Sequence, residues 1–209
     1  DTLSLHDALP ISLCIGVLLV LGLTAYFAQN LGYGPLTNAD GRYYYIYLRS
    51  LLVDHDINLS NDYLLSTPDF PFHNYYGFAL TRTGYAGNPF GIGPALLWLP
   101  LFLVAHGIAL VRRALGAPPA VLEPLSHMHQ SITLLASYFA GCCAVWFSYV
   151  LARRHAAPGV ACLSVVGFLA SSPLFFYMLW SPSYAHALGA GAVAAVLCYW
   201  QGTQGREDL

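Results

Sequence analysis

The sequence contains no lysine, and charged residues make up only 9% of its 209 residues. Soluble domains carry roughly 25% charged residues, so this chain cannot cover a water-facing globule. Hydrophobic residues amount to 57% and the mean hydropathy is +0.56. The formal net charge of -2 gives no basis for nucleic-acid binding. This composition predicts an all-α integral membrane protein whose main partner is the lipid bilayer.

Cysteine is also scarce, and its placement excludes two classes of site. All five cysteines lie inside apolar segments, where they are typical small buried hydrophobes. The adjacent pair faces different sides of a helix, which excludes a paired redox or metal role. We therefore expect no disulfide framework and no zinc site. The cysteines are Cys14, Cys142, Cys143, Cys162 and Cys198.

Four segments are long and apolar enough to cross a bilayer, which needs about 20 residues. A fifth segment, 94–111, is apolar but shorter, and Pro100, His106 and Gly107 interrupt it. The sequence therefore predicts four transmembrane helices plus a large first outer loop with surface or re-entrant helices. The four predicted spans are residues 11–28, 131–151, 160–179 and 184–200.

The two ends of the chain differ from the rest. Residues 1–11 resemble a translated sequencing adaptor, so we expect a non-native leader there; an ordinary short leader is the alternative. Residues 201–209 form a truncated tail soon after the last predicted span. We expect residues 12–200 to be the N-terminal part of a longer transmembrane domain.

Residues 30–128 make up the large loop. Within it, 41–53 predicts a helix lying on the membrane, with tyrosines and leucines in one stripe and Arg42 and Arg49 on another face. Tyrosine rings suit the headgroup level, where the hydroxyl stays in water. Residues 54–90 are rich in Asn, Pro, Gly and aromatics and are expected to form a loop. The stripe comprises Tyr43, Tyr44, Tyr47, Leu48, Leu51 and Leu52.

The segment 94–111 decides the topology. If it spans the membrane, Asp40 and the turn 181–186 lie on opposite sides and cannot form one site. A plain arginine count would then favour a cytoplasmic Asp40 loop. The short turn 152–158, with Arg153 and Arg154, is the best cytoplasmic marker, because the positive-inside rule weights short loops. We therefore prefer a non-spanning 94–111 and an extracytoplasmic loop 30–128.

This order of features resembles the GT-C superfamily of membrane glycosyltransferases, which use polyprenyl-phosphate sugars. The similar members are the protein O-mannosyltransferases, the bacterial aminoarabinose transferases and the RgtA/B/C/D-like transferases. Several of these families carry two adjacent acids where this chain carries one. The resemblance covers most of residues 12–200. Its motifs are Asp40 after the first span, YYYIYLRSLL (43–52), DHDINLSNDY (54–63), GIGPALLWLP (91–100), YVLARR (149–154) and the turn Ser183–His186.

The resemblance implies transfer of a hexose or pentose from a polyprenyl-phosphate donor to a glycan, lipid or protein acceptor, in a bacterial inner membrane. The acceptor hydroxyl must lose its proton while the anomeric carbon gains positive charge, and a nearby carboxylate serves both needs. Asp40 is the predicted catalytic residue, as general base or charge stabiliser. The alternative is a helix N-cap, a role compatible with catalysis.

The phosphate leaving group needs positive donors near the bilayer surface, and Arg can bind phosphate through two hydrogen bonds. Arg42, Arg49 and Arg82 are available, with snorkelling at the headgroups as the alternative. His186, at the outer start of the last span, is expected to contact substrate or phosphate, or else to pack at the interface. The predicted substrate- or phosphate-binding residues are Arg42, Tyr44, Arg82, His73 and His186.

No metal site is predicted. His127 and His129 are two residues apart, which splays their rings on a helix. Residues 54–65 begin like a calcium loop, but Leu59 and Leu65 stand where an EF-hand needs Gly and Glu. The acids of this stretch could still attract a divalent cation, and a solvated acidic loop is the alternative.

Two other function classes compete with a glycosyltransferase. One is a multi-span transporter or flippase fragment for a lipid-linked substrate, without catalysis. Transporters usually carry ionisable groups or broken helices near the bilayer midplane, whereas here the polar residues gather in one loop. The other is a membrane scaffold without chemistry, which the clustering of Asp, Arg, His and Tyr in the loop disfavours.

Overall fold

The computed structural model describes residues 20–28, 30, 36–66 and 80–203. These residues form helices and no strand, which confirms the all-α prediction. Residues 20–28 are helical. The elements that follow are α2 (Asp40–Arg49), the π-helical η1 (Ser50–Asp54), α3 (Ser60–Ser66), α4 (Gly93–Ala114), the 3₁₀ helix η3 (Pro119–Leu122), α5 (His127–Arg153), α6 (Pro158–Ser171), α7 (Leu174–Leu179) and α8 (His186–Thr203).

Two helical segments of the described chain are long and apolar enough to cross a membrane: α4, and Pro119–Arg153, which includes α5. Of the four predicted spans, 131–151 lies in one of these segments, and residues 11–19 of the first predicted span lie outside the described chain. The other segment, α4, contains residues 94–111, which were expected not to span, so four spans are not shown. The prediction of one continuous helix over 160–179 is wrong, because α6 ends at Ser171 and α7 begins at Leu174. Pro173 lies in this break; it has no N–H to continue the ladder of α6.

The segment 94–111 is not the short, interrupted helix that the sequence predicts. α4 runs unbroken for 22 residues through Pro100, whose ring lies on an exposed face. Pro94 occupies the first turn, where its fixed φ and missing N–H suit a helix start. Gly116, with φ 95°, follows the last turn and ends the helix in the left-handed conformation that glycine tolerates.

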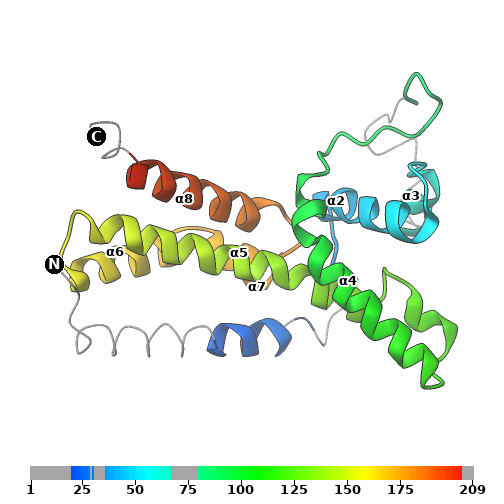
Figure 1. The fold of residues 1–209 in the computed structure, drawn as a ribbon, viewed down its shortest axis with the longest axis horizontal. Helices are drawn as coiled ribbons and strands as arrows, with labels where there is room; N and C mark the ends of the chain where they lie inside the picture. The colour runs from blue at the N-terminus through cyan, green and yellow to red at the C-terminus, as the bar shows by residue number, and fades with distance from the viewer. Residues whose placement is uncertain (1–19, 29, 31–35, 67–79, 204–209) are drawn as a thin grey trace.

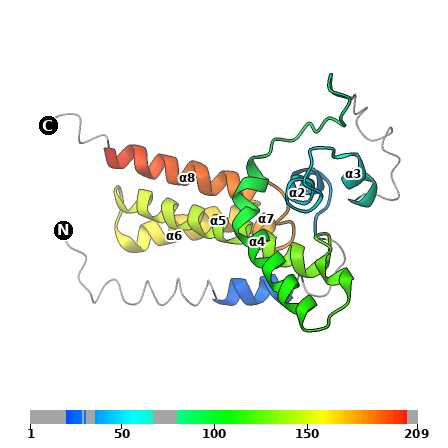
Figure 2. The same cartoon turned by 45° about the vertical axis from the view of Figure 1, so that its right-hand side comes forward.

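A long bundle forms one part of the molecule. α5, α6 and α8 lie side by side, and the helix at residues 20–28 lies on the side of α5 away from α8 (Figures 1 and 2). The Tyr26 hydroxyl donates to the Ser131 carbonyl at 2.9 Å, tying this helix to α5. A Cβ at Gly191 would lie 2.6 Å from the Ala140 carbonyl oxygen, so glycine lets α8 approach the backbone of α5 closely.

The second part, α2, α3 and α4, lies at one end of this bundle (Figures 1 and 2). Trp98 of α4 is fully buried and its Nε1 donates to Ser137 Oγ of α5 at 2.9 Å. Tyr45 of α2 packs on Trp98, with ring centroids 6.5 Å apart. Leu188 of α8 belongs to the same buried cluster. α2 therefore packs on the apolar helices α4, α5 and α8 and not on loop residues alone.

The predicted helix 41–53 is confirmed as α2 and η1, but its predicted faces are partly wrong. Tyr45 and Ile46, outside the predicted stripe, have no exposed surface, whereas Leu51 of the stripe is 42% exposed. Arg49, expected on a polar face, is buried. The region 54–90 contains α3 and is therefore not wholly loop; its residues 67–79 lie outside the described chain.

Candidate active site

Asp40 is the first residue of α2. The preceding Ala39 has φ 39° and ψ -126°, and it occupies the N-cap position with no side-chain capping bond. The predicted alternative, Asp40 as the N-cap, is therefore wrong. Within the described chain, no hydrogen bond or ion pair holds the half-buried Asp40 carboxylate. Among the residues that the structure describes, the carboxylate thus has no structural partner.

The start of α2 rests on the turn between α7 and α8. A Cβ at Gly41 would overlap Ser183 Oγ and Cβ and would lie 2.8 Å from the Ser183 carbonyl oxygen. Ser183 is fully buried at this contact. Only glycine allows such an approach without moving backbone. Asp40 is therefore next in sequence to one partner of this contact, Gly41, and His186 comes three residues after the other partner, Ser183.

We expect Gly41→Ala to separate these two segments. The added methyl group meets backbone as well as the Ser183 side chain, so relief requires α2 to shift. Overpacking of this kind costs about 1–3 kcal/mol of stability. Unfolding of the purified protein measures this cost. Gly107→Ala is the control, because a Cβ there has nothing within 4 Å and lies in a helix interior. Equal stability of the two variants would contradict the contact.

His186 lies at the exposed start of α8, against two tyrosines. Its ring centroid is 4.2 Å from that of Tyr177 and 5.9 Å from that of Tyr184. Tyr184 belongs to the turn that the sequence highlights. Tyr177, within α7, was missed, and nothing in its nine-residue spacing from His186 signals the contact. The imidazole therefore packs against one ring from α7 and one from the turn that contacts Gly41.

Tyr44 lies one helical turn after Asp40. Its ring meets Phe90 edge-on, with centroids 5.2 Å apart, and approaches Trp98 at 6.3 Å. Burial first, and the negative charge of Asp40 second, raise the pKa of Tyr44 above its ordinary value. Tyr44 and Asp40, four residues apart, therefore lie on one side of α2 and interact electrostatically.

Arg42 is held by the chain just before α2. Its Nε donates to the Thr37 carbonyl at 3.1 Å, and its Nη nitrogens have no hydrogen-bond partner in the described chain. Thr37 is itself anchored: its N–H and hydroxyl donate to Gln130 Oε1 at 2.9 and 3.2 Å. Gln130 Nε2 donates to the Leu125 carbonyl at 2.6 Å. This buried glutamine, which the sequence analysis missed, ties the Asp40 segment to α5.

Arg49 is not the available phosphate donor that the sequence predicts. Its Nη1 contacts Asp54 at 2.5 Å and Asp62 at 2.8 Å, and its Nε contacts Glu123 at 3.4 Å. Burial lowers the pKa of Arg49, but the hydrogen bond to Asp62 and the charges of Asp54 and Glu123 outweigh burial and raise it. The Arg49 guanidinium is therefore the positive charge that balances the acidic side chains of Asp54, Asp62 and Glu123.

Within the described residues, no group of three or more His, Cys, Asp or Glu side chains is placed so that it could hold a metal ion. The predicted splaying of His127 and His129 is confirmed: His127 Nδ1 pairs with Ser131 Oγ at 3.3 Å, and His129 Nδ1 pairs with Ser126 Oγ at 2.9 Å. His129 is fully buried beside His106, with ring centroids 5.8 Å apart.

Two predicted site residues are not part of this arrangement. Arg82 is exposed in a turn in which Thr81 N–H donates to the Tyr85 carbonyl at 2.8 Å. The turn extends away from the start of α2 (Figure 1). His73 lies outside the described residues.

The residues around the start of α2 form a chemically coherent set. An uncommitted carboxylate, that of Asp40, can accept a proton or stabilise positive charge. Arg42 Nη, without a hydrogen-bond partner in the described chain, and the His186 imidazole, exposed at the start of α8, can each donate to an anion. No family model, curated protein or solved structure matches the chain.

Proposed function

We propose that the protein transfers a sugar from a polyprenyl-phosphate donor to an extracytoplasmic glycan, lipid or protein acceptor. The observation that carries the proposal is the uncommitted Asp40 carboxylate beside the turn that bears His186. The acceptor hydroxyl gives its proton to Asp40 as its oxygen bonds to the anomeric carbon. The bond from that carbon to the phosphate oxygen breaks, and polyprenyl phosphate leaves. Arg42 and His186 are the donors available to the leaving phosphate.

Four passages cross a bacterial inner membrane in the proposed arrangement: 11–28, α5, the α6–α7 pair and α8. α5 leads away from α2, and α6–α7 leads back (Figure 1). Because Gly41 touches Ser183, an even number of crossings must separate them, and these two passages supply it. A crossing by α4 in addition to these two would part residues that are in contact, so α4 does not cross in the proposed arrangement. The arginine-rich turn 152–158 is cytoplasmic in this arrangement, and the proposed site therefore faces outward with α4 on the same side.

Cysteine labelling tests this topology. Ile57 is 62% exposed in the loop, and Ala157 is exposed in the turn after α5. In intact cells, a membrane-impermeant maleimide should label Ile57→Cys and should reach Ala157→Cys only after permeabilisation. The reverse pattern would place the loop in the cytoplasm and refute the proposal.

A transporter is less consistent with the charge distribution. α6, α7 and α8 contain no Asp, Glu, Lys or Arg, whereas transporters use ionisable groups within their spans. Membrane vesicles given polyprenyl-phosphate mannose or polyprenyl-phosphate aminoarabinose, with the sugar radiolabelled, separate the two classes. We expect label in covalent linkage to an acceptor. Label that crosses the membrane on an intact donor would identify a flippase instead.

A further inference from the structure

α4 has one packed face and one bare apolar face. Ala95, Trp98, Phe102, Ala105 and Ala109 form the packed face and are buried. The opposite face exposes large aliphatic side chains, each between 51% and 60% accessible. A bare face of this size is stable only in contact with apolar surroundings. Its residues are Leu96, Leu97, Leu103, Val104, Leu110 and Val111.

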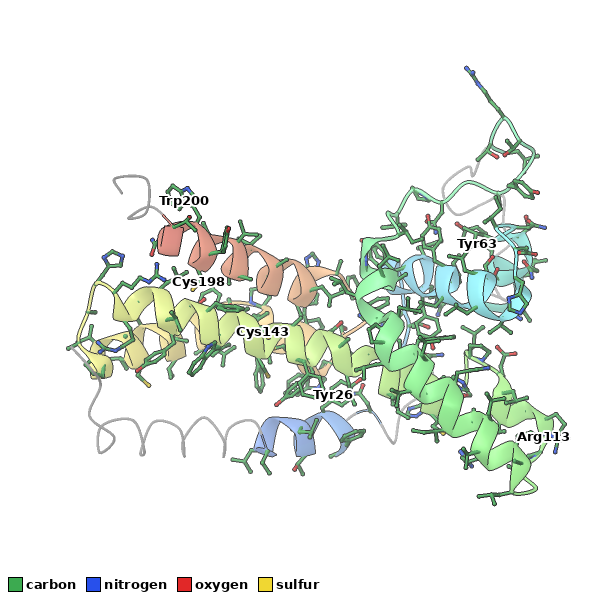
Figure 3. The ribbon with its side chains drawn as sticks, viewed as in Figure 1. Tyr26, Tyr63, Arg113, Cys143, Cys198 and Trp200 are labelled. Carbon is green, nitrogen blue, oxygen red and sulfur yellow. The ribbon has the colours of Figure 1, made fainter. Side chains whose placement is uncertain are left out.

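The axis of α4 is steeply inclined to the bundle of α5 and α8 (Figures 1 and 2). With 22 residues it is about 33 Å long. Its last turn carries Arg112 and Arg113, both exposed, and Arg113 lies at the far end of the helix from the bundle (Figure 3). A helix lying in the interface would keep its leucines in the acyl boundary and its arginines among headgroups.

Within the described chain, no acidic side chain forms an ion pair with these two arginines. Arg112 Nη1 approaches Met128 Sδ at 3.1 Å, and Arg113 Nη1 donates to the Ala117 carbonyl at 3.1 Å. Every ion pair of the described chain involves Arg49 instead. Residues 80–122 contain three arginines and no Asp or Glu. The helix dipole favours cations at this end but leaves their outer N–H groups unpaired in the described chain.

We infer that α4 is an interfacial helix whose Arg112 and Arg113 bind the phosphates of anionic phospholipids. Arg pairs with phosphate through two parallel hydrogen bonds, and anionic lipid attracts each basic residue near its surface. The bare apolar face lies in the boundary of the same leaflet. This inference shares with the proposed function only the placement of α4 and does not depend on sugar transfer.

Lipid-quenching of a fluorophore tests the inference in the full chain reconstituted in vesicles. A bimane fluorophore is attached to the cysteine of Val111→Cys. Its quenching by spin-labelled phosphatidylglycerol is compared with its quenching by spin-labelled phosphatidylcholine. We expect preferential quenching by phosphatidylglycerol, with about a fivefold loss of preference for each arginine removed by Arg112→Gln and Arg113→Gln. The charge-conserving pair Arg112→Lys and Arg113→Lys should retain most of it. Loss of the preference in the lysine variant as well would show that charge is not the cause.

The chain supplies a matched control and a second measurement. Arg153→Gln with Arg154→Gln removes an arginine pair at the other end of α5 and should leave the preference at residue 111 unchanged. Equal quenching by both lipids in the protein that keeps both arginines would overturn the inference.

The depth of α4 is a second measurement. A bimane on Val104→Cys should be quenched best by headgroup-level labels. Strongest quenching by chain-centre labels would show that α4 spans the bilayer.

Discussion

Asp40→Asn should lower sugar transfer by about 10²–10⁴-fold, the usual contribution of general acid–base catalysis. The asparagine amide has the shape of the carboxylate. It can neither take the proton of the acceptor hydroxyl at neutral pH nor offset the positive charge on the anomeric carbon. Expression and membrane insertion should persist, because Asp40 makes no hydrogen bond or ion pair within the described chain. Initial rates at saturating donor, corrected for protein amount, measure the effect.

Asp56→Asn provides the control for Asp40. Asp56 is exposed in the same loop, and its Oδ1 accepts from Ser50 Oγ at 2.9 Å and from the Asn58 N–H at 3.1 Å. An asparagine carbonyl preserves both bonds, so transfer should stay near the normal rate. An Asp40→Asn protein as active as the control would exclude the catalytic role while leaving the fold untouched.

Arg49→Met should reduce the free energy of unfolding by about 3–5 kcal/mol, the cost of removing one partner from a buried charge cluster. Three carboxylates, those of Asp54, Asp62 and Glu123, would lose their shared cation. Asp62 suffers most because its side chain is fully buried. Chemical unfolding in detergent measures the change. Arg82→Met is the control, since Arg82 is exposed and outside the ion pairs of the described chain.

The size of this loss should depend on pH. Burial raises the pKa of the Asp62 carboxyl, and the hydrogen bond from Arg49 offsets part of that rise. Without Arg49 the folded-state pKa rises further above the unfolded one. Such a group stabilises the fold while protonated, and this contribution is lost as pH rises through the folded pKa. Arg49→Met should therefore be least damaging in mild acid; a penalty independent of pH would contradict a buried, unpaired Asp62.

The sequence predicted helices well where periodicity and hydropathy dominate. The span 131–151 lies within α5 and the span 184–200 falls largely within α8, because a lipid-exposed helix has few other options. The prediction of a single helix over 160–179 failed because Ser172 and Pro173 break the chain into α6 and α7, although its hydropathy is continuous. The prediction also failed on α2, where Tyr45 is buried against Trp98 and Phe102 of α4 and Ile46 is buried in a cluster with Leu59 and Tyr63. These neighbours lie far away in the sequence, so periodicity does not reveal them.

The candidate site was partly predictable for a related reason. Asp40 and His186 were identified from residue type and position beside apolar segments. Their supports, Gln130 and Tyr177, are 93 and nine residues away from what they hold, so no local pattern marks them. Arg49 was misassigned because its three acids come from three separate stretches. Long-range polar pairing is a tertiary property, and a single sequence does not display it.

The contact of Gly41 with Ser183 also bears on how the loop can be studied. The start of α2 rests on Ser183, more than a hundred positions later, and Leu48 of α2 shares a buried cluster with Leu134 of α5 and Leu188 of α8. Residues 30–128 cut out on their own would lose these contacts and leave the apolar side of α2 uncovered. Asp40 therefore keeps its surroundings only in a protein that retains α5, α7 and α8.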